Sequence, residues 1–301
     1  MLVSRWTVSG SPNGMGNTLL AARLEKSLSF LSTQLHVPVP NHGRHKKALD
    51  VLADPDLVEN VAPNRILAAH RLAWETFLIV AAALEDRRNG ASPYTQRRLR
   101  TFVKGPLERE GRDGSPRNVQ FELTVATHFR LASCTVYDGE PDILLLFGQE
   151  KVGIAAKRVR SLNPTQLRKR AKEAAEQIDK SKMRGWVALN LDTRVADIAY
   201  DGGDGGATTE KLSRAFDEVS ETLAALGSPN VLGHMMFGYL ASWHPPVGSD
   251  PAGLHFGVPF RWMCIPRRDG DEALFSTFSR GWAERFDRRM VAMQRPTFNR
   301  L

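Results

Sequence analysis

The sequence PDILLLFGQEKVGIAAK, residues 141–157, contains two apolar runs of strand length joined by a short polar turn. Apolar runs of this length, bounded by turn residues, are typical of buried strands. The first predicted strand, 143–147, begins next to Asp142, so this carboxylate is expected at a strand end that faces a cleft. The second predicted strand, 152–156, ends at Lys157. A carboxylate and an ammonium group are therefore expected on consecutive strands.

Helical patterns flank this pair of strands. Residues 118–133 carry apolar side chains at helical spacing with Glu122 beside them, and residues 164–182 combine an apolar stripe with a basic outer side. Further apolar runs predict strands at 186–191, 231–240 and 256–265, and further periodic patterns predict helices at 208–226 and 271–290. The central order of helix, strand, strand, helix and strand predicts an α/β fold.

The first third of the chain is predicted to be helical. Its most regular pattern runs from Pro63 to Arg88, and Pro63 suits the first turn of a helix. Other helices are predicted at 17–34 and 93–103, with a loop at 37–45. Residues 105–117, rich in Gly, Pro and charge, mark a boundary. We therefore predict a helical amino-terminal region, 1–110, followed by a second domain, 111–301.

Composition limits the class of protein. The hydrophobic content of 42% is enough for a packed core. No stretch approaches the roughly 18 consecutive apolar residues needed to cross a bilayer, and the amino terminus lacks the pattern of a secretory signal. A cytoplasmic protein without a membrane partner is expected. Cys134 and Cys264 have no CxxC spacing, so neither a disulfide framework nor a zinc site is predicted.

Positive charge is concentrated in residues 151–184, which hold eleven Lys and Arg residues and only three acidic ones. The whole chain has a net charge of +8, which favours a polyanionic partner, although a charge run can also form a solvated helix face. Contacts to a phosphate backbone provide affinity rather than sequence preference. The candidates for such contacts are Arg158, Arg160, Arg168, Lys169, Arg170, Lys172 and Lys180.

These features resemble the PD-(D/E)xK, or restriction-endonuclease-like, nuclease superfamily. Its motif places an Asp on one strand and an acidic-x-Lys triplet on the adjoining strand, which Asp142 and Lys157 match. Members often carry a Glu on the preceding helix and a Gln on the helix after the Lys strand, matched here by Glu122 and Gln177. The resemblance spans residues 118–191 and leaves the rest of the chain outside it.

The resemblance implies a mixed β-sheet flanked by helices and a Mg²⁺ or Mn²⁺ cofactor. A bound divalent ion neutralises charge at a phosphodiester and activates water. In this picture Asp142 ligates the ion, Glu122 reaches it directly or through water, and the main-chain carbonyl of Ala156 supplies another oxygen. Lys157 would orient or deprotonate the attacking water, and Gln177 would hydrogen-bond into the site or to the phosphate backbone.

The chain departs from this motif at Ala155, where an acid is expected. A methyl group cannot coordinate a cation, so metal binding and rate should both fall steeply. One explanation is a deliberate acid-to-alanine inactivation, which we favour because the other matching residues remain. The other is a naturally degenerate member that binds DNA without cutting it. Glu150 or Glu140 is a possible substitute ligand, although Glu150 lies nearly a full strand away.

The sequence thus predicts a metal-dependent DNA endonuclease in a catalytically impaired form, with antiphage defence or restriction as the expected setting. The alternative is a nuclease-fold protein that binds nucleic acid or acts as an assembly subunit, and RNA is a third candidate substrate. The helical amino-terminal region is expected to recruit a protein partner or to shape the cleft. A homo-oligomer fits this function because paired sites can cut both strands of a duplex.

Overall fold

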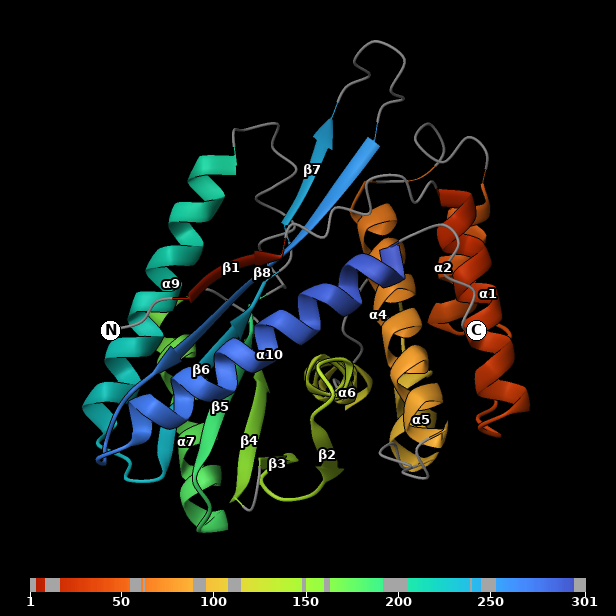
Figure 1. Ribbon diagram of the computed structural model, residues 1–301. Coiled ribbons are helices and arrows are strands. Elements are labelled where there is room, and N and C mark those ends of the chain that lie inside the picture. The colour runs from red at the N-terminus through yellow and green to blue at the C-terminus, as the bar shows by residue number, and fades with distance from the viewer. Residues whose placement is uncertain are drawn as a thin grey trace. The chain divides into compact units, whose positions relative to one another are not determined.

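The computed structural model describes residues 4–8, 17–54, 61, 63–88, 96–107, 115–147, 150–159, 163–191, 205–238, 240–244 and 253–294. The chain divides into two compact units, which are described separately (Figure 1). The sheet unit comprises Met1–Asn13 and Ala132–Val291, and the helical unit comprises Gly14–Leu131 and Ala292–Leu301.

The sheet unit contains a mixed open sheet with the strand order β1-β8-β6-β5-β4-β3-β2, and β7 pairs with β8. The strands are β1 (Ser4–Val8), β2 (Thr135–Asp138), β3 (Ile143–Phe147), β4 (Glu150–Arg158), β5 (Gly185–Asn190), β6 (Val231–Phe237), β7 (Leu240–His244) and β8 (Gly253–Cys264). Strands β2, β3 and β4 form an antiparallel meander. Strands β5 and β6 run parallel to β4, whereas β8 is antiparallel to both β6 and β1.

Helices supply the connections that parallel strands require. Helix α7 (Pro164–Ser181) connects β4 to β5, and α9 (Gly205–Leu226) precedes β6. The apolar stripe of α7 joins one hydrophobic cluster with residues of β4, β5, β6 and α9. Its members include Leu167, Ala171, Ala174, Ala175 and Ile178 of α7, Ala155 of β4, Val187 and Leu189 of β5, Met236 of β6 and Val219 of α9. The predicted α/β class is confirmed.

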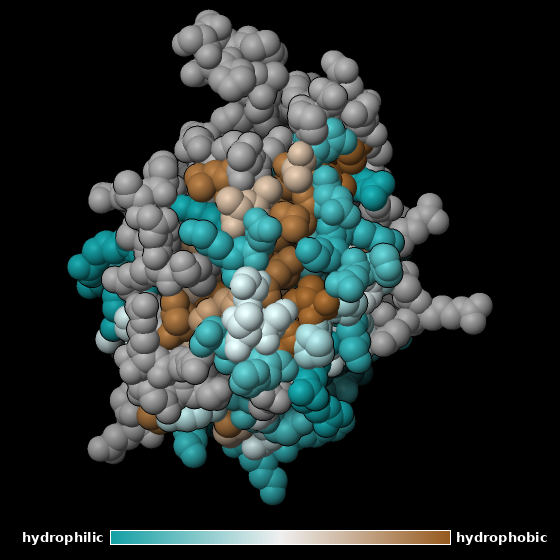
Figure 2. All heavy atoms as spheres, turned by 90° about the vertical axis from the view of Figure 1, so that its right-hand side faces the viewer, coloured by the Kyte–Doolittle hydropathy of each residue, from teal (hydrophilic) through white to brown (hydrophobic). Residues whose placement is uncertain are grey.

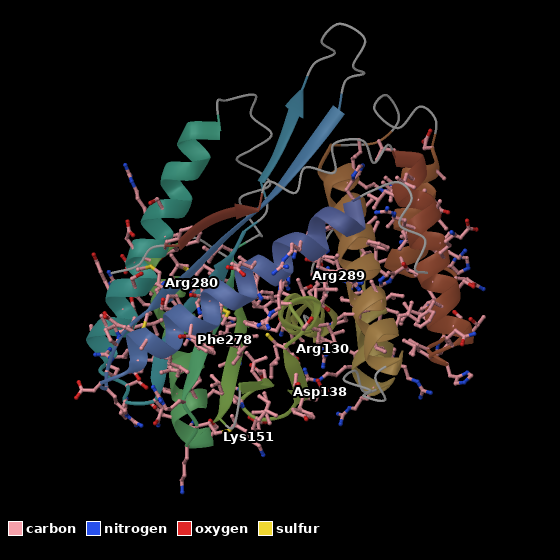
Figure 3. All side chains as sticks on the ribbon, in the orientation of Figure 1. Arg130, Asp138, Lys151, Phe278, Arg280 and Arg289 are labelled. Atoms are coloured by element: carbon pink, nitrogen blue, oxygen red, sulfur yellow. The ribbon has the colours of Figure 1, made fainter. Side chains whose placement is uncertain are left out.

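Helix α10 (Asp271–Gln294) packs through aromatic side chains. Trp186 of β5 stacks on Phe278 with ring centroids 5.3 Å apart, and Trp262 of β8 meets Phe278 and Trp282 edge to face. Figure 3 labels Phe278 and Arg280 on this helix, and of the two only Arg280 is exposed. Strand β5 alternates between this aromatic cluster and the α7 cluster, so all of its residues are buried, as expected for a central parallel strand.

The helical unit contains α1 (Asn17–Thr33), α2 (Arg44–Ala53), α4 (Pro63–Arg88), α5 (Gln96–Phe102) and α6 (Ser115–Leu131). A buried set of polar contacts links four of these helices, α2, α4, α5 and α6. The Arg44 Nη1 group donates to Gln120 Oε1 at 2.6 Å, and Gln120 Nε2 donates to the Glu75 carboxylate. Arg44 Nη2 also donates to the carbonyl of Phe102. These buried polar groups thus bond to one another inside the core of the unit.

The surface of the helical unit is mixed in character. Figure 2 faces the side on which α1 and α2 lie in Figure 1, and hydrophilic residues cover most of its described part, with hydrophobic residues visible between them. Among the described helices, none combines the length and apolar character that a membrane span requires.

The longest regular patterns were predicted best. The predicted helix at 63–88 coincides with α4, and the predicted strand at 143–147 coincides with β3. Most other predicted bounds differ from the observed ones by a few residues. The run predicted as one strand at 231–240 forms β6 and the start of β7. Helix 93–103 is observed from Gln96, and its predicted first residues lie outside the described part of the chain.

Three elements differ from the prediction. The predicted loop at 37–45 is wrong at its end because α2 begins at Arg44, and Arg44, Ala48 and Val51 are buried at helical spacing. Strands β1 and β2 were not predicted. Both are short and polar, and β1 pairs with β8, which is distant in sequence.

The compact units separate at Leu131, after α6, rather than at residue 110. These units are defined by contacts alone, so the domain boundary stays a prediction.

Candidate active site

The carboxylate of Asp142 lies where β3 separates from β4. The pairing of these two strands begins at Ile143 and Ile154. On β4, the amide of Gly153 donates toward β5, and so does that of Val159 beyond the strand's end. Because amides alternate in direction along a strand, Ala156 directs its N–H to the β3 side. The Oδ2 atom of Asp142 accepts this N–H at 2.7 Å. The Asp142 side chain thus takes the place of a carbonyl on the neighbouring strand and accepts the hydrogen bond of the Ala156 amide.

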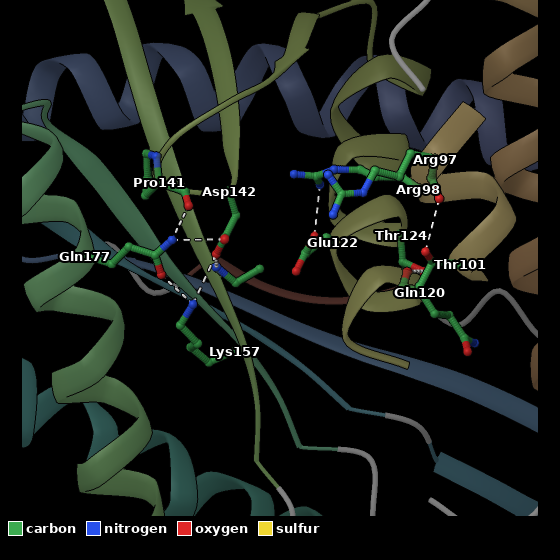
Figure 4. Close-up of polar contacts among 11 residues, drawn as sticks. Arg97, Arg98, Thr101, Gln120, Glu122, Thr124, Pro141, Asp142, Lys157 and Gln177 are labelled. Atoms are coloured by element: carbon green, nitrogen blue, oxygen red, sulfur yellow. Dashed lines mark hydrogen bonds and ion pairs between the residues drawn. The ribbon is translucent and has the colours of Figure 1, made fainter. Parts of the chain in front are cut away.

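Lys157 and Gln177 complete a closed network around Asp142 (Figure 4). The Lys157 ammonium donates to Asp142 Oδ2 at 3.3 Å and to Gln177 Oε1. The Gln177 amide donates in turn to Asp142 Oδ1 at 3.0 Å and to the carbonyl of Pro141. Three of the predicted site residues therefore meet in one place, on β4, on α7 and just before β3. Side-chain exposures of 16% for Asp142 and 24% for Lys157 leave the network open to solvent.

Gly153 permits the chain before Asp142 to pack closely on β4. A Cβ atom at residue 153 would lie 2.6 Å from Cδ of Pro141, which is closer than carbon atoms normally approach. Any larger residue would push Pro141 away and displace the carboxylate of Asp142 with it. Both Gly153 and the Pro141 carbonyl were missed by the sequence prediction, because a close approach between two strands has no local sequence pattern.

Ala155 belongs to the hydrophobic cluster under α7 and is fully buried. Alternation along β4 directs its methyl group to the same face as the Lys157 side chain. That face is the one on which the Lys157 ammonium meets Gln177 of α7. An acidic side chain at residue 155 would therefore lie on the face that carries the network.

Glu122 belongs to the helical unit, where it accepts a hydrogen bond from Arg98 Nη1 at 2.9 Å (Figure 4). This contact joins α6 to α5. The predicted convergence of Glu122 with Asp142 relates two units that are described separately, so it stays a prediction.

The predicted phosphate contacts occupy different environments. Lys169 and Lys180 are exposed on α7. Arg168 pairs with Glu218 of α9, Arg170 Nη1 lies 2.6 Å from Glu173 Oε2, and Lys172 Nζ lies 3.9 Å from Glu176 Oε1. Arg158 is only 6% exposed, so its position does not suit a surface contact, and Arg160 lies outside the described residues. Lys169 and Lys180 are thus the best placed of the set.

The strands supply only part of a metal site. Mg²⁺ in proteins keeps several waters and takes one or two carboxylates, whereas Ca²⁺ takes about six to eight oxygens. The network contains one carboxylate, that of Asp142, and both of its oxygens already accept hydrogen bonds. No cluster of three or more His, Cys, Asp and Glu side chains suited to a metal occurs among the described residues. With alanine at 155, these residues provide only part of the ligand set of a divalent ion.

The two cysteines do not supply an alternative nucleophile. Cys134 and Cys264 are both free, and burial raises the pKa of each thiol to about 11. Because the thiolate is the reactive form, little of either side chain is in that form near neutral pH.

Comparison with known proteins identifies no relative: no family model, curated protein or solved structure matches the chain significantly. The function of the chain is therefore inferred from its own contacts, chiefly from the network of Asp142, Lys157 and Gln177.

Proposed function

We propose that the chain has a PD-(D/E)xK nuclease scaffold whose function is metal-dependent hydrolysis of DNA phosphodiesters, in a form that Ala155 impairs. One observation carries this proposal. The ammonium of Lys157 lies 3.3 Å from the carboxylate of Asp142, which precedes the neighbouring strand, and Gln177 hydrogen-bonds to both. These are three residues for which the sequence resemblance predicts a common site.

The order of elements supports the same proposal. Helix α6 precedes the antiparallel meander of β2, β3 and β4, after which α7 crosses over to the parallel strand β5. A restriction-endonuclease-like fold, as the resemblance implies, places the Asp and Lys strands side by side in such a meander. The Gln-bearing crossover helix then lies over the Lys strand, as α7 does over β4.

The chemistry assigned to the chain's own residues is positioning and charge compensation. A divalent ion, when bound, supplies neutralisation of the phosphate and activation of water. Asp142 and the carbonyl of Ala156 would hold it. The Lys157 ammonium offsets charge that develops on the phosphate, and Gln177 keeps that ammonium beside Asp142. An acid at residue 155 would supply a second carboxylate on the same face.

The partner that fits the exposed side of α7 is a nucleic-acid backbone. Lys169 and Lys180 lie on this side. We take DNA as the substrate and Mg²⁺ or Mn²⁺ as the cofactor, in antiphage defence or restriction. In this proposal the helical unit recruits a protein partner, and a homo-oligomer pairs two sites.

The test restores an acid at residue 155. Ala155→Glu, incubated with plasmid DNA and Mg²⁺ or Mn²⁺, is expected to cut, and adding Lys157→Ala is expected to abolish cutting. Ala155→Gln is the matched control because it brings the same volume into the buried position without a charge. Equal cutting by the Glu and Gln variants, or none by either, would argue against the enzyme.

One observation favours the second candidate, a protein that binds nucleic acid without cutting it. Both oxygens of Asp142 are already engaged by donors of the protein, so the network is complete as it stands. DNA binding without cutting in the Ala155→Glu variant would support this function. Parallel incubations with RNA decide between the two nucleic acids.

A further inference from the structure

The two faces of the antiparallel meander differ in burial. Residues directly opposed in antiparallel strands point to the same face, and successive residues alternate between faces. One face carries only buried apolar side chains: Val136, Ile143, Leu145, Val152, Ile154 and Ala156. The opposite face carries five exposed or half-buried side chains: Thr135, Tyr137, Leu144, Leu146 and Lys151. We call these five residues the open face.

The open face and the Asp142 network lie on the same side of the sheet. Gly153 pairs with Leu144 of the open face, and alternation along β4 places Gly153 and Lys157 on one side. On this side α7 packs against β4 and β5, whereas β2 is the edge strand beyond β3 (Figure 1). The network therefore lies at the border between the part of the sheet that α7 covers and the open face.

The turn between β2 and β3 joins the open face to the network. A Cβ atom at Gly139 would lie 2.7 Å from Cδ1 of Leu144, and one at Gly153 would lie 2.6 Å from Cδ of Pro141. The Pro141 carbonyl accepts a hydrogen bond from Gln177. The turn thus packs on the open face at one end and bonds to the network at the other, which holds the two in a defined arrangement.

Tyr137 indicates the kind of ligand that fits the open face. It is 50% exposed, and it and Leu226 are the two exposed large hydrophobic side chains in the described part of the chain. Leu144 lies directly opposite Tyr137 on β3 and is half-buried. An exposed aromatic ring beside aliphatic side chains is a surface on which a nucleic-acid base can stack. A base within a duplex is already stacked on both sides, so the ring suits an unpaired base.

Lysines supply positive charge along the same side of the sheet. Lys151 is exposed on the open face (Figure 3), and Lys157 is 24% exposed in the network. Lys180 is exposed and follows Gln177 by three residues, which makes the two neighbours on the surface of α7. Against these stand Glu140 in the turn and Asp142, which pairs with Lys157. An aromatic ring with surrounding lysines is typical of single-strand binding surfaces.

The strand register gives the spacing between the ring and the network. Tyr137 is level with Leu144 and Gly153. It is therefore two strand spacings, or about 10 Å, from β4. Lys157 lies four residues farther along β4, which is about 13 Å. A short unpaired segment can bridge this distance, with one base at Tyr137 and a phosphate group at Lys157.

We propose that the open face binds an unpaired segment of DNA, with a base stacked on Tyr137 and the backbone running past the lysines to Lys157. This inference deepens the proposed function, on which it rests. It names the substrate class of the same site as single-stranded DNA or the unpaired end of a duplex.

The experiment measures fluorescence anisotropy of a labelled single strand and of the blunt-ended duplex with the same sequence, mixed with the full chain in a chelator of divalent ions. Tyr137→Ala is expected to weaken single-strand binding about tenfold or more and duplex binding little. Tyr137→Phe keeps the ring and should retain most of the affinity. Leu226→Ala is the matched control, because it removes the other exposed large apolar side chain.

Photocrosslinking adds a readout that does not depend on affinity. A single strand that contains bromodeoxyuridine should crosslink to the peptide that carries Tyr137, as mass spectrometry of the digest would show. Crosslinks confined to other peptides, or equal single-strand affinity of Tyr137→Ala and Leu226→Ala, overturn the inference. So does a loss shared equally by single strand and duplex. Self-association that Tyr137→Ala abolishes, with single-strand binding unchanged, would assign the open face to a second copy of the chain instead.

The inference and the proposed function can fail separately. If Tyr137→Ala behaves like Leu226→Ala while Ala155→Glu cuts DNA with Mn²⁺, the inference is wrong and the nuclease stands. If Tyr137 proves necessary for single-strand binding but no variant cuts DNA, the binding face stands and the nuclease function is wrong.

Discussion

Each unit of this protein contains a cluster of charged and amide side chains, and the two clusters differ in burial. In the helical unit, Arg44, Glu75 and Gln120 are 1%, 2% and 3% exposed. In the sheet unit, the side chains of Asp142 and Lys157 are 16% and 24% exposed. Both clusters use the same chemistry of a carboxylate, a cation and an amide.

The difference in burial separates a structural role from a binding role. A fully buried polar network has exchanged its water for partners of fixed geometry, so breaking it is costly and no ligand can reach it. A partly exposed network keeps access to solvent, and a ligand can replace one of its internal contacts. The following four predictions test this contrast, beginning with the largest expected effect.

Arg44→Met is expected to lower the free energy of unfolding by about 3–5 kcal/mol, because it leaves the buried acceptors on Gln120 and Phe102 without their charged donor. Asp142→Asn, in the exposed cluster, should cost only about 1 kcal/mol, since the pair with Lys157 is reachable by water. Urea unfolding of both variants gives the comparison. Equal losses of unfolding free energy in the two variants would contradict a structural role for the buried cluster of the helical unit.

Acidification should weaken the helical unit through His70. Burial lowers the pKa of His70 to about 4, whereas an unfolded chain has a histidine pKa of about 6.5. Between these two values the unfolded state binds more protons than the folded state. The contribution of His70 to the free energy of unfolding is therefore fully present above pH 6.5, and it falls by roughly 3 kcal/mol between about pH 6.5 and 4. Urea unfolding across this range measures the fall.

His70→Leu is the comparison for this titration. Other groups titrate in both proteins, so only the difference between the two pH profiles reports on His70. The variant should lose less stability on acidification than the unmodified chain. Parallel profiles would show that His70 does not titrate in this way.

Removal of two exposed lysines should weaken DNA binding if the sheet unit holds the interface. Lys169→Ala with Lys180→Ala is expected to reduce the slope of log affinity against log salt by about one per lysine. The matched control is Lys26→Ala with Lys47→Ala, which removes two exposed lysines of the helical unit. Fluorescence anisotropy at several salt concentrations gives both slopes. A larger change in the control would move the interface to the helical unit.

The smallest effect is expected at the start of α7. The Asn163 side chain accepts a hydrogen bond from the amide of Thr165 at 2.9 Å and so caps the helix. Asn163→Ala should cost about 1 kcal/mol of stability, while Asn163→Asp should cost little because aspartate also caps. Thermal unfolding of both variants tests this, and a loss shared equally by the two would assign another role to the side chain.

The sequence predicted those parts of the fold that local periodicity determines. Helix α4 repeats its apolar residues over many turns, and β3 is a continuous apolar run, so both were found with their bounds. Strand β2 is short and has exposed Thr135 and Tyr137 on one side, which gives a weak pattern. Strand β1 is ordered by its pairing with β8, and no local pattern records such a distant partner.

The candidate site was predicted in part for the same reason. The resemblance to the PD-(D/E)xK motif predicted a common site for Asp142, Lys157 and Gln177, and these three side chains do meet. The sequence prediction assumed that Arg158, as a basic residue, would be exposed. It is buried because both faces of β4 are covered, which the local sequence does not show.

The close packing at Gly153 affects which substitutions would impair this protein. The residue contributes no functional group, yet its missing side chain leaves the space in which the Pro141 ring lies. A survey of harmful substitutions should therefore report residue 153 alongside Asp142 and Lys157. Alanine at 153 would leave every side chain of the network present and still shift the Asp142 carboxylate. Loss of function in this variant would therefore result from displacement of that carboxylate and not from removal of a functional group.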